Sequence, residues 1–350
     1  MEPNKKFAIL SAQKWKDYYP LQVVYEWENI IAETLSIPLD VDSQIEINHI
    51  FDKPASRLFQ KFVRHSFLKN FIDISNNYLL RKKRGIYFIN FHLYVAETVN
   101  HYVYQPNSIP IIIDCFRDKV DLVPILYRKN PLVFVTDIEV FTYLQATSIA
   151  PKLKFVPLSI SNKYLKKKVP AKKIDVLQMG RQNTVLHHWM MELTAKHPSI
   201  EYVYAKREND KQVYWSTTRG LLDVPTETRE QFMAFLGSAR ISLVSSPGVD
   251  DHGTVTRTGG FNPVTPRFYE SAVNYCYMIG RFPDAPDFIY NKVASVCERP
   301  DSYEAFEQQV LSMLATPFNQ QERYRPFIQQ HLTGTIAMML KKELDQLQAQ

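Results

Sequence analysis

The chain has 350 residues, 45% of them hydrophobic and 13% aromatic, with a formal net charge of +6. This length suits two ordinary domains, and the hydrophobic share is normal for a globular protein. The sequence has no run of 18 apolar residues, which excludes a membrane-spanning helix, and its three cysteines lie far apart without a CxxC, which indicates reduced thiols.

The first half of the chain alternates between strand and helix patterns. The run at 110–114 reads as a buried strand, and the run at 132–136 is similar. The predicted strands cover residues 7–10, 45–50, 86–89, 110–114, 132–136 and 154–157, and the predicted helices cover 21–35, 55–80, 94–104 and 138–145. Such alternation predicts a mainly parallel α/β domain over residues 1–158, with helices on both faces of its sheet.

A polar, basic segment containing Pro170 follows at 159–173, and we interpret it as a linker. The alternation then restarts and predicts a second α/β domain over 174–318, followed by a C-terminal helical segment at 319–350. The strands are expected at 174–178, 201–205, 240–245, 277–279 and 293–296, and the helices after Thr184 and Thr265 and at 226–237, 302–314 and 323–347.

The most informative stretch is 265–272, which a Gly-rich run at 253–260 precedes. Thr265 suits the N-cap of a helix, and Pro266 suits its first position. Arg267 and Glu270 then fall on one helical face. A Gly-rich loop, a positive helix N-terminus, an Arg and a Glu together suit a negatively charged ligand with hydroxyl groups, such as a sugar nucleotide.

This stretch resembles the donor-site motif of group-1 nucleotide-sugar glycosyltransferases, whose GT-B fold has two Rossmann-like domains facing across a cleft. The motif lies in the second half of the chain, and the first half matches by layout alone. The resemblance implies that 1–158 binds the acceptor, that 174–318 binds the donor and that 319–350 packs back toward the first domain. It also implies that Glu270 holds the donor ribose and that no metal or cofactor is needed beyond the nucleotide-sugar substrate.

The donor-binding candidates surround the carboxyl ends of the second domain's strands, where ligands of open α/β sheets bind. Arg181 would supply a fixed cation near the donor diphosphate, with Lys206 or Arg207 as its partner. Asn262 stands eight positions before Glu270, where many retaining relatives have a second Glu, so the stereochemistry stays open. The full set is Gly180, Arg181, Lys206, Arg207, Ser246, Pro247, Asn262, Thr265, Arg267, Tyr269 and Glu270.

The catalytic candidates are Arg181, which would stabilise the leaving phosphate, and a general base for the acceptor hydroxyl. Asp114 follows the best strand of the first domain, and Asp137 and His92 are alternatives; an Asp at a strand end is also a common helix cap. The histidines lack zinc-binding spacing, and we interpret the DxD at 40–42 as a turn.

The sequence therefore predicts transfer of a sugar from a nucleotide-sugar donor to a glycan or lipid-linked acceptor, in surface polysaccharide biosynthesis. The alternatives are an inactive glycosyltransferase-like partner subunit and a GT-B sugar-nucleotide epimerase or hydrolase. We expect a cytoplasmic location, at the inner membrane face if the basic clusters at 81–84, 166–168 and 172–173 contact anionic lipid. They could equally be solvated loops, and no nucleic-acid partner is expected.

Overall fold

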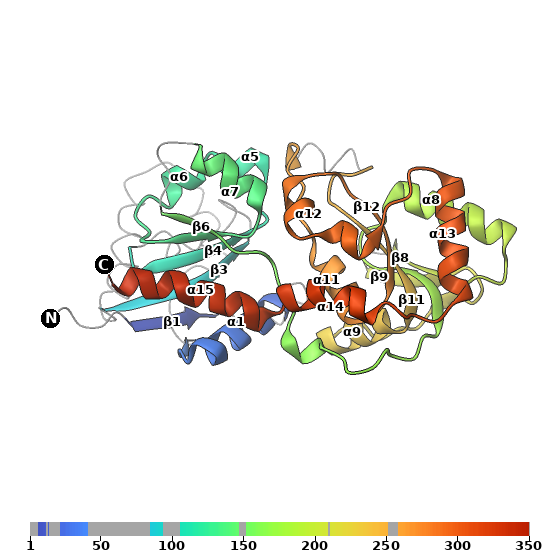
Figure 1. Cartoon of the computed structure of the whole chain (residues 1–350), viewed down its shortest axis with the longest axis horizontal. Coiled ribbons are helices and arrows are strands. Elements are labelled where there is room, and N and C mark those ends of the chain that lie inside the picture. Colours follow the sequence, from blue (N-terminus) through green and yellow to red (C-terminus); the bar gives the residue numbers. More distant parts are fainter. Residues whose placement is uncertain are drawn as a thin grey trace. The chain divides into compact units, whose positions relative to one another are not determined.

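A computed structural model describes residues 6–11, 13, 22–40, 85–93, 106–146, 152–208, 211–250 and 258–349. The chain divides into two compact units, Met1–Val156 with Ala337–Gln350, and Pro157–Ile336 (Figure 1). The strand expected at 45–50, the helices expected at 55–80 and 94–104, and the basic cluster at 81–84 lie outside the described residues. The domain boundaries expected from the sequence stay a prediction.

The first unit contains a six-stranded sheet of order β2-β1-β3-β4-β5-β6, and every pairing in it is parallel. Figure 1 shows α5, α6 and α7 on one side of these strands and α1 and α15 on the other. The strands are β1 (Lys6–Leu10), β2 (Leu39–Asp40), β3 (Ile86–Leu93), β4 (Ser108–Ile113), β5 (Val133–Val135) and β6 (Leu153–Phe155). The helices are α1 (Gln22–Leu35), α5 (Arg117–Val120), α6 (Val123–Leu126), α7 (Ile138–Gln145) and the C-terminal part of α15 (Thr333–Gln348).

The second unit contains a seven-stranded sheet of order β10-β9-β8-β7-β11-β12-β13. Its strands are β7 (Ile174–Gln178), β8 (Tyr202–Glu208), β9 (Lys211–Ser216), β10 (Gly220–Leu222), β11 (Ala239–Ser245), β12 (Tyr277–Arg281) and β13 (Cys297–Glu298). The β8–β9 and β9–β10 pairings are antiparallel, and the other pairings of this sheet are parallel. The helices are η3 (Asn162–Tyr164), α8 (Thr184–Lys196), α9 (Arg229–Gly237), α11 (Pro266–Val273), α12 (Pro286–Tyr290), η4 (Val293–Ser295), α13 (Tyr303–Ala315) and α14 (Gln321–Gln330).

Both sheets have the doubly wound order, in which the chain moves outward in one direction and then returns to build the other side. The predicted fold class, two Rossmann-like α/β domains, is therefore confirmed. The direction of winding reverses between β1 and β3 in the first sheet and between β7 and β11 in the second. Ligands of such sheets bind at the carboxyl ends of the two strands that flank this point.

Several elements differ from the sequence-based expectations, each for a local reason. The N-cap of α8 is Asn183, whose side chain accepts a hydrogen bond from the Leu186 amide, and that of α9 is Thr228, which forms a capping box with Gln231. The predicted strand at 293–296 is the short helix η4 followed by β13. The predicted helix at 323–347 is two helices, because the chain leaves the helix after α14 and Leu332 pairs with Ile160.

The segment 159–173, expected as a linker, belongs to the second unit and contains η3. The Ile160 amide donates to the His331 carbonyl at 2.8 Å, and Ser159 and Thr333 share a 3.0 Å hydrogen bond between their hydroxyls. From Ala337 onward α15 belongs to the first unit, where Glu343 pairs with Lys154 at 2.7 Å. Within the described residues, no helix has both the length and the apolar character to cross a bilayer.

Close packing between β11, β12 and β13 gives a first testable expectation. A Cβ added to Gly280 in β12 would lie 2.9 Å from the Cys297 sulfur and 3.1 Å from the Val244 carbonyl oxygen. The contact with sulfur is closer than a Cβ atom tolerates and the contact with the carbonyl oxygen is unusually tight, and the backbone of an inner strand cannot easily move away. We expect Gly280→Ala to lower the free energy of unfolding by about 1–3 kcal/mol. Urea denaturation measures this, and an unchanged midpoint would show that the sheet is less tightly packed than described.

Candidate functional site

The strands that flank the winding reversal of the second sheet lead directly into predicted donor residues. Gly180 and Arg181 follow β7, and Ser246 and Pro247 follow β11. Gly180 has a φ of +75°, a conformation that glycine adopts without steric cost. The chain turns sharply there and leaves its backbone accessible at the position where this class of sheet binds ligands.

Helix α11 brings the predicted Arg and Glu to the same place. Thr265 is its N-cap and Pro266 occupies its first turn, as predicted from the sequence, although the Thr265 side chain makes no capping hydrogen bond. A Cβ added to Gly180 would lie 3.4 Å from Arg267 Nη2. The guanidinium of Arg267 therefore lies directly beside the turn after β7, and the structure brings Gly180, Arg267 and Glu270 together.

Glu270 is held by two arginines rather than one. Its carboxylate lies 2.6 Å from Arg229 Nη1 and 3.3 Å from Arg267 Nη1. Arg229 begins α9, and both guanidinium groups also lie over the ring of Phe232, at 5.3 Å for Arg229 and 4.6 Å for Arg267. We call these three charged residues, Arg229, Arg267 and Glu270, the buried triad; it carries a net charge of +1.

The members of the buried triad differ in exposure. The side chains of Glu270 and Arg229 are only 4% and 7% exposed, whereas that of Arg267 is 20% exposed. Burial by itself would raise the pKa of Glu270, but the charges of Arg229 and Arg267 and the hydrogen bond from Arg229 outweigh it, so that the pKa lies below its ordinary value. Glu270 is therefore ionised at neutral pH, and Arg267 is the member that reaches solvent.

Arg267 also has unused hydrogen-bonding capacity. Among the described residues, its buried Nη1 atom has no aligned hydrogen-bond partner, and neither has Oε2 of Glu270, although the two atoms are 3.3 Å apart. A buried donor on a charged group normally finds a partner. Nη1 is buried against Glu270, whereas Nη2 is the atom that lies beside Gly180, so an anionic ligand at this turn could accept a hydrogen bond from Nη2.

The loop after β11 is fixed from two sides. The Ser246 amide donates to the Arg281 carbonyl at 3.0 Å, and the Arg281 guanidinium binds Asp250 through two hydrogen bonds of 2.8 and 3.1 Å. Asn183 donates to the same carboxylate at 3.1 Å. Asp250 has a φ of +59°, so this loop is held in a conformation that its own sequence does not favour.

For the other predicted donor residues, the structure gives local contacts or exposure. The expectation that Lys206 and Arg207 follow a strand is wrong: β8 continues through both, because it pairs with β9, and Lys206 forms an ion pair with Glu208 at 2.8 Å. Tyr269 is buried, and its ring stacks on Phe327. The Asn262 side chain donates to the Gly260 carbonyl at 2.6 Å. Arg181 is exposed.

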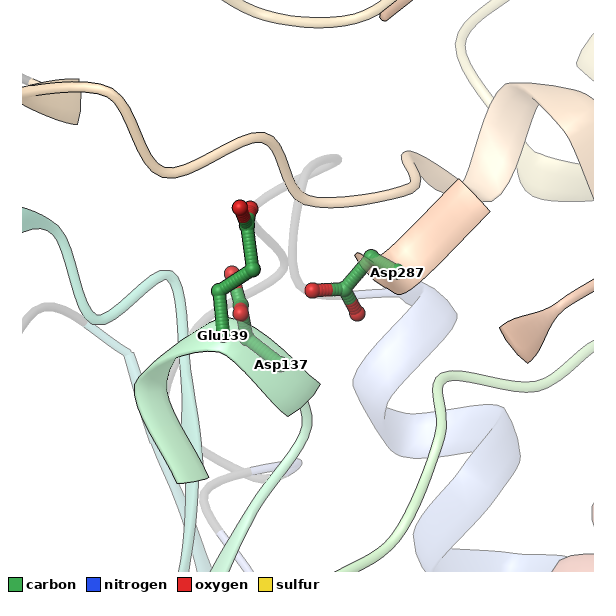
Figure 2. A group of neighbouring side chains, drawn as sticks. All are labelled: Asp137, Glu139 and Asp287. Carbon is green, nitrogen blue, oxygen red and sulfur yellow. The ribbon is translucent and has the colours of Figure 1, made fainter. Parts of the chain in front are cut away.

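Two base candidates of the first unit follow neighbouring strands, whereas His92, expected after the strand at 86–89, lies within β3 because that strand continues to Leu93. Asp114 comes directly after β4 with a φ of +55°. Asp137 follows β5 and caps α7 by accepting a 3.0 Å hydrogen bond from the Val140 amide, and Figure 2 shows Glu139 on the same turn. His92 is buried on β3, where its Nδ1 contacts the Tyr127 hydroxyl, and burial lowers its pKa to about 4. His92 is therefore neutral at pH 7.

The sequence reasoning missed a buried carboxyl at the winding reversal of this unit. Ser11 follows β1, and its hydroxyl donates to Glu28 of α1; the Gln13 amide donates to the same oxygen at 3.2 Å. Burial raises the pKa of Glu28 to about 7, and the hydrogen bonds from Ser11 and Gln13 offset only part of this effect. No sequence pattern indicated this pair, because its members are 17 residues apart.

Glu28 gives a second testable expectation. Its folded-state pKa of about 7 exceeds the ordinary 4.5, so the folded chain binds more protons than the unfolded chain between these values. The contribution to stability is full below pH 4.5 and is lost as the pH rises through 7, by an amount on the order of 3 kcal/mol. Glu28→Gln should be more stable than wild type above pH 7 and similar at low pH. Urea titrations across this range measure it, and a constant difference would contradict it.

No protein-family model and no curated protein matches the chain. Among solved structures, it is similar to a chain of the GtfA/B complex at 11% identity and a TM-score of 0.49, covering 79% of this chain and 61% of that one. It is also similar to a protein assigned as a UDP-N-acetylglucosamine 2-epimerase from Listeria monocytogenes, at 11% identity and a TM-score of 0.49. This similarity covers 97% of this chain and 95% of that one. Identity at this level transfers no function to the chain.

Proposed function

We propose that the chain is a glycosyltransferase that uses a nucleotide-sugar donor, and that the donor phosphates bind beside Gly180 and Arg267. The single observation that carries this proposal is the partly exposed Arg267 guanidinium, whose Nη2 atom lies beside Gly180 at the winding reversal of the second sheet. A guanidinium gives a phosphate paired, directional hydrogen bonds. The N-terminus of α11 adds a favourable dipole.

In this proposal the protein's own charges stabilise the leaving group. As the glycosidic bond of the donor breaks, negative charge grows on the diphosphate, and Arg267 offsets it together with Arg181 and the helix N-terminus. A fixed cation of this kind makes a metal ion unnecessary. Ser246 and Pro247, on the fixed loop after β11, would contact the base or sugar of the donor.

We assign Glu270 a positioning role. Because Arg229 and Arg267 both bind its carboxylate, Glu270 is not available to ribose hydroxyls in the described state. It fixes the guanidinium of Arg267 instead, and Arg229 compensates its charge. Arg229 binds Oε1, so the ribose contact that the family resemblance implies would use the buried Oε2, which faces Arg267, and would require that oxygen to become accessible.

The acceptor in this proposal binds to the first unit and is a glycan or lipid-linked sugar, as in surface polysaccharide assembly. An inverting reaction needs a base for its hydroxyl. Asp114, half-buried directly after β4, is the first base candidate; Asp137, which caps α7, and the buried His92 remain the alternatives.

Donor turnover tests the proposal. The chain is incubated with a panel of sugar nucleotides, with and without a mixture of glycan and lipid-linked acceptors, and the products are followed by mass spectrometry. Release of nucleoside diphosphate that depends on acceptor supports a glycosyltransferase. Turnover of donor alone favours an epimerase or hydrolase, and no turnover of any donor that binds favours an inactive partner subunit; either result rejects the proposed activity.

A further inference from the structure

The second unit contains a cavity at the edge of its sheet opposite to Gly180 and Arg267. It has a volume of about 370 Å³ and is lined by Val169, Pro170, Lys172, Arg240, Tyr277, Pro317 and Phe318. Arg240 and Tyr277 stand at the amino ends of β11 and β12, and Lys172 lies two residues before β7. A strand of five residues spans roughly 16 Å, so this cavity is separate from the proposed donor site.

The walls of the cavity combine aromatic and aliphatic surface with cations. The Phe318 ring packs against Tyr277 at 4.9 Å, and Val169, Pro170 and Pro317 complete the apolar lining. The cations are Lys172 and Arg240. Cavities that bind small molecules have this composition: mostly apolar walls with a few placed polar groups.

The charge of these cations is only weakly compensated. Lys172 donates to the carbonyls of Gly237 and Asn274 at 3.1 and 2.9 Å and contacts the Cys276 sulfur at 3.6 Å, and within the described residues no carboxylate forms an ion pair with it. Those carbonyls stand at the ends of α9 and α11, whose dipoles offset part of the charge. Burial lowers the pKa of Lys172, which is the expected cost of a cation without a counter-ion.

Among the described residues, Arg240 forms one ion pair, and its distance of 3.8 Å is long. Its Nη1 faces Asp175 across that gap, and its Nη2 donates to the carbonyls of Leu314 at 2.6 Å and Thr316 at 3.5 Å. The segment 166–173 adds further positive charge, since it contains four lysines besides Lys172 and no acidic residue. The tyrosine hydroxyl of the cavity is already used, because Tyr277 donates to Pro317 and Asn319.

We propose that this cavity binds a small organic anion in which a phosphate or carboxylate group is joined to an apolar body. The anionic group would accept hydrogen bonds from Arg240 and would be attracted by the charge of Lys172, whose three N–H groups already have partners. The apolar body would pack between Phe318, Val169 and the prolines. The volume corresponds to roughly twelve water molecules, which suits an aromatic ring or a short chain rather than a whole sugar nucleotide.

Titration calorimetry with phenyl phosphate tests the proposal. Inorganic phosphate and phenol, the two parts of this probe, are titrated separately for comparison. We expect phenyl phosphate to bind at least about tenfold more tightly than either half. Val169→Trp, which fills the cavity without removing a polar contact, and Arg240→Gln should each weaken binding by about tenfold or more. Arg299→Gln, which removes an exposed cation of the same unit, should leave binding unchanged.

Two results would overturn the proposal. One is equal binding of inorganic phosphate and phenyl phosphate, or no binding of either. The other is binding that Arg267→Gln abolishes and Val169→Trp leaves intact, which would place the probe at the donor site. If Arg240→Gln does not fold, the binding of phenyl phosphate to Val169→Trp still tests whether the probe occupies this cavity. Phosphatidylcholine vesicles with and without phosphatidic acid identify the source: binding to the acidic vesicles that Val169→Trp removes indicates a lipid, and its absence indicates a free small molecule.

Discussion

Glu270→Ala is expected to lower the free energy of unfolding by about 3–5 kcal/mol, because it leaves the buried guanidinium of Arg229 without its carboxylate. Thermal or urea unfolding of the purified variant measures the loss. Asp345→Ala is the matched control: its 2.8 Å ion pair with Lys341 is exposed on both sides, and its removal should change stability by less than about 1 kcal/mol.

Measuring the unfolding free energy of wild type and Glu270→Ala at several pH values separates the loss of a charge from the loss of packing at Glu270. The pKa of Glu270 is depressed in the folded chain, so its contribution is present above the ordinary value of 4.5 and is lost as the pH falls through the folded-state pKa. The difference between wild type and Glu270→Ala should therefore shrink in acid. A difference that stays constant with pH, or a loss no larger than that of the Asp345 control, would contradict the assignment of a charged buried triad.

Arg267→Gln is expected to weaken the binding of a nucleoside diphosphate by roughly 10- to 100-fold, because a charge-assisted hydrogen bond to phosphate is lost. Calorimetric titration with UDP, GDP, ADP and dTDP measures it. Arg299→Gln serves as the control, since its ion pair with Asp284 lies on the surface of the same unit. Equal affinities of wild type and Arg267→Gln would remove Arg267 from the proposed site.

Much of the fold could be predicted from the sequence where a pattern is local. The apolar run of β7 gave the bounds Ile174–Gln178, and α7 occupies Ile138–Gln145 as expected, because in both cases the residues that decide the element lie within it. The start of α11 at Thr265 and Pro266 follows from the same kind of local chemistry.

The parts that could not be predicted depend on contacts between distant residues. Arg229 and Glu270 are 41 positions apart and meet only because α9 and α11 pack together, so nothing near Glu270 indicated its partner. The β8–β9 pairing likewise moved Lys206 and Arg207 into a strand. A weak hint for Arg229 was present in the sequence: it follows the capping Thr228 and lies three residues before Phe232, where a charged helix start meets an apolar face.

The most direct measurement is a crystal structure of the chain with the tightest-binding of UDP, GDP, ADP and dTDP. Our account predicts the phosphates beside the Gly180 turn, within hydrogen-bonding distance of the Arg267 guanidinium, with Glu270 still paired to Arg229. A nucleotide bound away from Gly180 and Arg267 would contradict the proposed donor site. A nucleotide bound there with its ribose on Glu270 would keep the site and reject the purely positioning role of Glu270.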